Sequence, residues 1–177
     1  MLAGMMAAAV LAVLGATAIA AKAATTPVTA AADADVPPSA VEDFTYPGAA
    51  TILAQKNIKL ISGDGNILLV DCTTPADGDI GLLKVWTTEE NIGTSGKGLV
   101  CFKVYATTGL LNLEVPGVFE IRGDGLKAGT GHDVVAKLET DDGDKLSVDV
   151  DPDGSTPVGV GVAGDPATVL LQLQVNG

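Results

Sequence analysis

The chain has 177 residues, and its 22 aspartates and glutamates outnumber its 10 lysines and arginines, which gives a formal net charge of −12. Binding to nucleic acid or to an anionic membrane surface needs clustered cations, so this composition excludes both as general functions. Hydrophobic residues make up 47% of the chain, enough for a packed core, whereas aromatic residues make up 3% and limit any stacking surface.

Residues 1–23 form a continuous apolar segment rich in alanine, leucine and valine. The segment ends in Ala21-Lys22-Ala23, the small-x-small pattern that signal peptidase recognises, so we predict a signal peptide that is cleaved after Ala23. No lysine or arginine precedes the apolar run, which is unusual for an export signal. The alternative is an uncleaved membrane anchor, but alanine transfers weakly into hydrocarbon and favours cleavage. We therefore expect a secreted, extracellular protein that has no membrane attachment after cleavage.

Residues 24–47 combine alanine, threonine, clustered proline and four acidic residues, without a period of 2 or 3.6. Such a segment buries too little apolar surface to fold, so we predict a disordered linker. The folded domain is then expected to span residues 48–177.

From Gly48 onward, short runs of isoleucine, leucine and valine alternate with turns rich in glycine, aspartate and proline. This pattern is typical of an all-β domain. Many short strands bury their apolar faces most efficiently in two packed antiparallel sheets, so we predict an immunoglobulin-like or jelly-roll-like β-sandwich, with a closed barrel as the alternative. The predicted strands are residues 50–54, 57–61, 66–72, 81–87, 99–106, 110–115, 118–121, 133–140, 145–150, 158–162 and 168–175.

Cys72 and Cys101 are the only cysteines of the chain. An even number of cysteines in an exported protein favours a disulfide, and each of the two lies in a predicted strand. The alternative is a pair of free buried thiols. We predict a structural disulfide, because a redox site would need closely spaced cysteines.

His132 is the only histidine, and it lies at the start of a predicted strand, where a surface position is expected. A serine hydrolase would have to recruit this residue, but none of the serines lies in a nucleophile-elbow context. The sequence therefore assigns no catalytic serine from Ser39, Ser62, Ser95, Ser147 and Ser155.

Two pairs of glutamates could in principle perform glycoside hydrolysis: Glu114 with Glu120, and Glu89 with Glu90. Sugar-cleaving sites usually present aromatic platforms, and the few aromatic residues here are expected in the core. No catalytic residue is assigned, and a small secreted hydrolase or hydrolase-associated domain is kept as the alternative function.

Asp149, Asp151 and Asp153 match the first acidic positions of an EF-hand loop. Position twelve of that loop would be Val160, which cannot supply the bidentate carboxylate, and the surrounding strand pattern excludes flanking helices. A weak extracellular calcium site and a solvated acidic turn both explain the three aspartates, and no other cofactor is indicated.

Arg122-Gly123-Asp124 is the tripeptide that integrin-type receptors recognise on an exposed loop tip. The same residues, followed by Gly125, are also ordinary turn chemistry. A match of three residues is too short to assign a receptor-binding function.

Three segments carry a resemblance to other proteins: residues 51–65 (TILAQKNIKLISGDG), 98–104 (GLVCFKV) and 170–175 (LLQLQV). With these segments the folded domain resembles uncharacterised secreted proteins of high-GC Gram-positive bacteria. The resemblance implies export and carries no catalytic or ligand-binding residues.

Taken together, the residues favour a secreted, non-catalytic β-sandwich that acts as a structural or partner-binding module. The expected partner is an extracellular protein or a component of the cell envelope, and not a nucleic acid or a membrane. Such a module needs only an exposed surface, whereas a hydrolase needs a convergent acid, base and nucleophile that the sequence does not supply.

Overall fold

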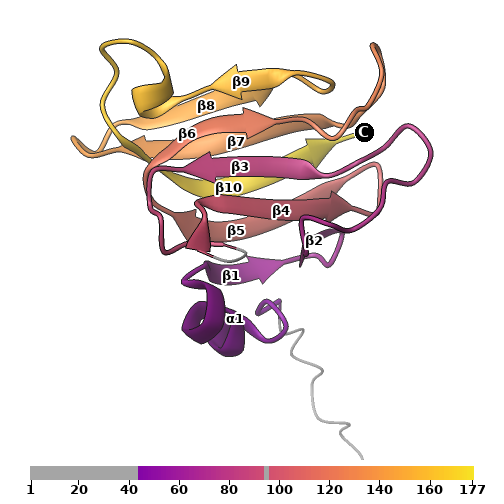
Figure 1. The fold of residues 1–177 in the computed structure, drawn as a ribbon, viewed down its shortest axis with the longest axis horizontal. Coiled ribbons are helices and arrows are strands. Elements are labelled where there is room, and N and C mark those ends of the chain that lie inside the picture. The colour runs from indigo at the N-terminus through magenta and orange to yellow at the C-terminus, as the bar shows by residue number, and fades with distance from the viewer. Residues whose placement is uncertain (1–43, 94–95) are drawn as a thin grey trace, which may run out of the picture. The chain divides into compact units, whose positions relative to one another are not determined.

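The computed structural model describes residues 44–93 and 96–177. These residues form two antiparallel five-stranded sheets that pack against each other (Figure 1), which confirms the predicted all-β sandwich. The predicted signal peptide, residues 1–23, lies outside the described residues, as does the predicted linker up to residue 43. No helix in the described part of the chain has the length and hydrophobicity that a membrane span requires.

The first sheet has the strand order β1-β5-β10-β7-β8, and every neighbouring pair in it is antiparallel. Buried and more exposed residues alternate along β5 and β7, as expected for strands with one face on the core and one face in water. In spatial order its strands are β1 (Lys59–Gly63), β5 (Gly109–Val115), β10 (Thr168–Asn176), β7 (Asp133–Thr140) and β8 (Lys145–Val150).

The second sheet has the strand order β2-β4-β3-β6-β9 and is also antiparallel throughout. Phe102 lies in its central part, opposite Leu69 on one side and Leu83 on the other, and is fully buried. In spatial order the strands are β2 (Ile67–Val70), β4 (Leu99–Val104), β3 (Leu83–Thr87), β6 (Val118–Arg122) and β9 (Ser155–Pro157).

The core lies between the sheets and is built almost entirely from aliphatic side chains. Each large side chain that is fully buried contributes about 1.5–3 kcal/mol of transfer free energy, so many moderate contributions replace the few large aromatic ones that the composition lacks. The largest fully buried side chains include Phe102, Leu83, Leu111, Leu113, Ile121, Leu138, Leu170 and Leu173.

A short helix, α1 (Ala49–Lys56), stands where residues 50–54 were predicted to form a strand. That prediction was wrong because the run is mostly alanine, leucine, glutamine and lysine, which favour a helix, while only two β-branched residues favour a strand. Asn57 ends the helix in the left-handed conformation (φ 53°), and its backbone N–H donates to the Leu53 carbonyl.

The strand predicted for residues 158–162 was also wrong, because a 3₁₀ turn at Gly159–Gly161 occupies most of this segment. Gly159 has a φ of 51°, which a residue in a strand does not adopt. The strand of this region is β9, immediately before the turn, and Val158 donates its backbone N–H to the Phe119 carbonyl.

The folded part begins before Gly48, so the predicted linker does not extend to residue 47. Tyr46 is only 6% exposed, and its hydroxyl accepts a hydrogen bond from the backbone N–H of Leu69 at 2.8 Å. Burial raises the pKa of Tyr46 above its usual range, and the Leu69 N–H offsets part of that rise. The Phe44 carbonyl accepts a hydrogen bond from Gly63, so this segment lies along the edge strand β1.

Cys72 and Cys101 form a disulfide, as predicted, with their Cα atoms 5.2 Å apart. Cys101 is a buried residue of β4 and Cys72 lies just beyond the end of β2, so the bond joins two neighbouring strands of the second sheet. The loop that it closes contains all of β3, the other neighbour of β4.

Candidate binding surface

A row of polar side chains crosses the outer face of the first sheet. Ser62 of β1 lies opposite Asn112 of β5, and Asn112 lies opposite Gln172 of β10. Gln172 in turn lies opposite Lys137 of β7, and Lys137 lies opposite Ser147 of β8. Because directly paired residues project from the same face of a sheet, these five side chains form one line, which we call the polar row.

Two strand irregularities aim the polar row outward. Leu170 and Leu173 are both fully buried although they are three residues apart, which a regular period of two does not allow. A register shift between Leu170 and Gln172 resolves the conflict and turns Gln172 away from the core. A second shift, between Leu60 and Ser62, does the same for Ser62 on β1.

Hydrogen bonds connect the first three members of the polar row. Asn112 Nδ2 donates to Ser62 Oγ at 2.9 Å, and Gln172 Nε2 donates to Asn112 Oδ1 at 2.7 Å. All three side chains belong to half-buried residues. Each bond restricts the rotamers of the groups that it joins, so this part of the row is ordered before any ligand arrives.

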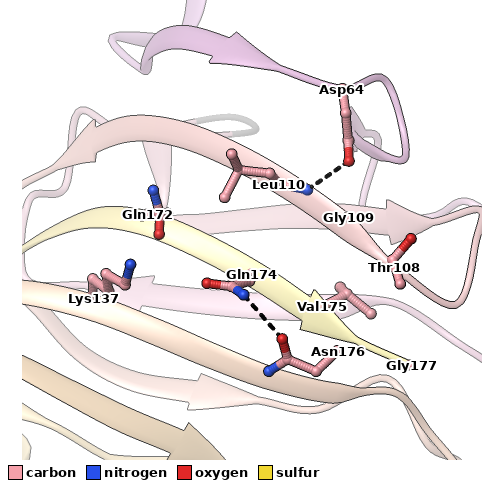
Figure 2. A pocket seen from close by; sticks show the side chains of 10 residues that line it. All are labelled: Asp64, Thr108, Gly109, Leu110, Lys137, Gln172, Gln174, Val175, Asn176 and Gly177. Carbon is pink, nitrogen blue, oxygen red and sulfur yellow. Dashed lines mark hydrogen bonds between the residues drawn. The ribbon is translucent and has the colours of Figure 1, made fainter.

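The Gln172 carbonyl oxygen, Oε1, is buried and has no hydrogen-bond partner among the described residues. In Figure 2 it points toward the part of the sheet where Lys137 and Gln174 lie. A buried acceptor without a donor costs about 1–3 kcal/mol. Because the oxygen is covered, a ligand donor reaches it only when the Gln172 amide turns toward the surface, and the bond then removes this cost.

Three adjoining hollows follow the polar row. The largest, of about 660 Å³, is lined by Lys137, Gln172, Gln174 and Asn176 among others (Figure 2). A second, of about 320 Å³, shares Lys137 and Gln172 with it and extends to Ser147. The third, of about 400 Å³, lies toward the β1 end of the row, where Phe44, Ser62, Leu110 and Asn112 contribute to its walls.

Few charged side chains of the described residues line these hollows: one carboxylate and two lysines. Asp64 is the one carboxylate among the described residues that line them, and its two oxygens accept the backbone N–H groups of Asn66 and Leu110, each at 3.0 Å. Two lysines, Lys137 and Lys145, also line the hollows. Most of the remaining polar groups are carboxamides and hydroxyls, which act as both donor and acceptor.

The three aspartates considered as calcium ligands differ in their surroundings: two accept backbone hydrogen bonds and the third is exposed on a strand. Asp151 Oδ1 accepts the backbone N–H of Asp153 at 3.2 Å, and Asp153 Oδ2 accepts that of Gly129 at 2.5 Å. Asp149 is exposed on β8. Within residues 44–93 and 96–177, no group of three or more histidine, cysteine, aspartate or glutamate side chains is placed to hold a metal ion.

His132 and Asp124 form a pair that the sequence did not reveal. The Asp124 side chain is fully buried; its Oδ1 accepts the backbone N–H of His132 at 2.9 Å, and its Oδ2 lies 2.7 Å from His132 Nδ1. The His132 side chain is 20% exposed, so the expected surface histidine is in fact mostly covered. Burial of Asp124 also prevents Arg122-Gly123-Asp124 from presenting its carboxylate to a receptor.

The other candidate catalytic residues do not converge on this pair. Glu114 on β5 pairs with Lys59, and Glu120 on β6 accepts a hydrogen bond from Ser155 at 2.8 Å, so the two glutamates belong to different sheets. Ser62 and Ser147 belong to the polar row, and Ser39 and Ser95 lie outside the described residues. The adjacent Glu89 and Glu90 are exposed.

Comparison with known proteins adds no functional assignment: no protein-family model matches the chain, and a search of curated proteins finds no match.

Proposed function

We propose that the protein is a secreted, non-catalytic β-sandwich module that binds an extracellular partner on the outer face of its first sheet. The observation that carries this proposal is the polar row, whose first three side chains, those of Ser62, Asn112 and Gln172, are joined by hydrogen bonds. Among the described residues, the Gln172 Oε1 atom has no hydrogen-bond partner. Groups that are ordered in advance lose less conformational entropy on binding, so such a row suits recognition better than mobile surface side chains do.

The position of the row supports the same proposal. It follows hollows on the open face of one sheet, where a partner can approach without any movement of the core. Its five members come from five strands of the sheet, so the sheet itself fixes their spacing. Sites built on rigid elements hold their geometry better than sites built on loops.

Export is supported by the apolar segment at residues 1–23 and by the disulfide between Cys72 and Cys101, a bond that persists in oxidising compartments. The test is to express the full chain in a secreting bacterial host and to sequence the N-terminus of the protein in the medium. The proposal predicts a mature protein that begins at Ala24. Cell-associated protein that begins at Met1 would contradict secretion.

Binding on this face is tested with two variants of the mature protein. Asn112→Ala with Gln172→Ala disrupts the polar row, whereas Gln55→Ala removes an exposed carboxamide from α1 and serves as the matched control. Both proteins are compared with the wild type for retention on immobilised cell-envelope polymers and extracellular proteins. We expect retention that the double variant loses and the control keeps. Equal behaviour of all three proteins on every probe would refute the proposal.

A hydrolase is the second candidate, and the pair of Asp124 and His132 is the observation that favours it. A buried carboxylate on Nδ1 fixes the orientation of a general-base histidine. His132 lines a hollow of about 310 Å³, whose other polar side chains are those of Asp77, Lys103, Tyr105 and Thr107. Turnover of ester, peptide, glycoside or phosphoester substrates that is lost in His132→Ala would establish this function, and no turnover would exclude it for those substrates.

A further inference from the structure

The chemistry of the polar row narrows the class of its partner. The row and the adjoining hollow present four carboxamides, from Asn112, Gln172, Gln174 and Asn176. Each carboxamide offers two N–H donors and a carbonyl acceptor, and neighbouring hydroxyl groups of a sugar offer donors and acceptors in the same way. A polyhydroxylated ligand can therefore satisfy such a surface without contributing any charge.

The carboxamides are arranged in pairs along the sheet. Gln172 donates to Asn112 at 2.7 Å. Gln174 donates to Asn176 at 3.0 Å, as Figure 2 shows. In each pair, one amide group is fixed by the other, while further donor and acceptor positions stay available. With strands about 4.8 Å apart, the row is about 19 Å long from β1 to β8, which suits a chain of several sugar units better than one small molecule.

Charge favours a neutral ligand. The whole chain carries a net charge of −12, which repels an anionic polymer. A cationic partner would find no available carboxylate in the polar row itself, because its charged member is Lys137. Elsewhere on this face charges of opposite sign adjoin, as in Lys59 with Glu114 and in Lys145 opposite Glu139. The polar row itself therefore attracts neither polyanions nor polycations strongly.

An apolar platform lies at the β1 end of the row. Phe44 is 57% exposed and Leu110 is 37% exposed, and both line the hollow that contains Ser62 and Asn112. The Phe44 backbone is fixed to the sheet, since its carbonyl accepts the N–H of Gly63 at 3.0 Å. Aromatic rings bind the C–H faces of sugar rings by burying apolar area, so this platform supplies the contact that carboxamides cannot.

We propose that the polar row binds a neutral polysaccharide. Hydroxyl groups of the polysaccharide form hydrogen bonds with Asn112, Gln172 and Lys137, and the face of one sugar ring packs against Phe44. This inference rests on the proposed function, because it assigns a ligand class to the same surface. A turn of the Gln172 amide would bring Oε1 to the surface, where it would accept a hydrogen bond from a ligand hydroxyl, a partner that it lacks among the described residues. An extended polypeptide and an anionic polysaccharide are the competing occupants.

The test is native affinity electrophoresis of the mature protein through gels that contain one polymer each. Amylose, galactomannan, xyloglucan and hydroxyethylcellulose are the neutral probes, polygalacturonate is the anionic probe and gelatin is the extended polypeptide. The proteins are the wild type, Asn112→Ala with Gln172→Ala, Phe44→Ala and the control Gln55→Ala. Thermal denaturation of each variant establishes that it is folded before its mobility is compared.

We expect at least one neutral polymer to retard the wild type and Gln55→Ala equally, at low and at high salt. Loss of the hydrogen bonds from two carboxamides should weaken that affinity about thirtyfold in the double variant. Phe44→Ala should weaken it as well, because it removes the platform.

Absence of retardation by every neutral polymer would overturn the inference. If polygalacturonate or gelatin retards the wild type and not the double variant, the ligand class is wrong and the proposed binding surface stands. If the double variant is retarded as strongly as the wild type by every polymer that binds, both the inference and the proposed surface are refuted.

Discussion

The disulfide between Cys72 and Cys101 should supply a large part of the stability of the fold. The two residues are separated by 29 positions, and the loop between them contains β3. In the chain-entropy model, opening a loop of this length costs about 3.6 kcal/mol, because the unfolded chain regains the freedom that the bond removed. The free energy of unfolding of a domain is typically about 5–15 kcal/mol, so we expect that opening this disulfide removes a substantial part of it.

The perturbation is the double substitution Cys72→Ala with Cys101→Ala, compared with the wild type in the presence and absence of a thiol reductant. For a domain of this size, 3.6 kcal/mol corresponds to a fall in Tm of about 10–15 °C. Thermal and guanidinium unfolding, followed by circular dichroism, measure the difference. The reduced wild type should unfold at a temperature between those of the oxidised wild type and the double variant, which itself should not respond to reductant.

Part of the loss in the double variant will come from packing, since Cys101 is buried and alanine leaves its sulfur site empty. The reduced wild type separates the two contributions, because it keeps both sulfur atoms and loses only the covalent bond. If the reduced wild type unfolds within about 1 kcal/mol of the oxidised protein, the loop-closure reasoning is refuted.

Three further changes test other parts of the structure. Tyr46→Phe should cost about 1–2 kcal/mol at neutral pH, because it leaves the Leu69 N–H without its acceptor. Since burial raises the pKa of Tyr46, its neutral phenol stabilises the fold below the usual phenol pKa, and this contribution is lost as pH rises; guanidinium unfolding in alkaline solution should show a smaller fall for the variant. Asp124→Ala should cost about 2–3 kcal/mol by leaving His132 unpaired, with a smaller loss for Asp124→Asn, and equal stability of all three proteins would refute the role of this pair. Asp151→Ala should lower Tm equally with and without millimolar Ca²⁺, because the Asp151 carboxylate stabilises its own turn; a Ca²⁺-dependent rise in the wild type that the variant lacks would instead establish the weak calcium site.

The sequence predicts a strand well where alternation is regular. The ranges 133–140 and 145–150 coincide with β7 and β8, because apolar and polar residues alternate along residues 136–139 and 145–150 and because Val134 and Val135 favour a strand. Prediction from the sequence fails where local backbone conformation determines the element. Residues 50–54 are too few to reveal a helical period, and the positive φ of Gly159 is not visible in the composition of its segment.

The polar row could not be predicted from the sequence, because it depends on strand order and register. Ser62, Asn112 and Gln172 are about fifty to sixty positions apart in sequence, and two register shifts are needed to place them on one face. A pattern of period two with no shift would assign Gln172 to the same face as the buried Leu170.

Similarly, nothing in the spacing of eight residues between Asp124 and His132 predicts their contact. That contact arises because the loop after β6 folds back beside the residue that precedes β7. The disulfide was predictable from parity alone, since the chain has no other cysteine with which either residue could pair.

The most direct test of the proposed binding surface is NMR of the side-chain amide groups while a retarding polymer, or an oligosaccharide derived from it, is added to the mature protein. Each asparagine and glutamine gives a separate pair of N–H signals, so the carboxamides report on their own surroundings. We predict that the signals of Asn112, Gln172 and Gln174 shift with ligand concentration while that of Gln55 stays constant. Shifts confined to residues of the second sheet, or an unchanged Gln172 signal at saturation, would contradict the account.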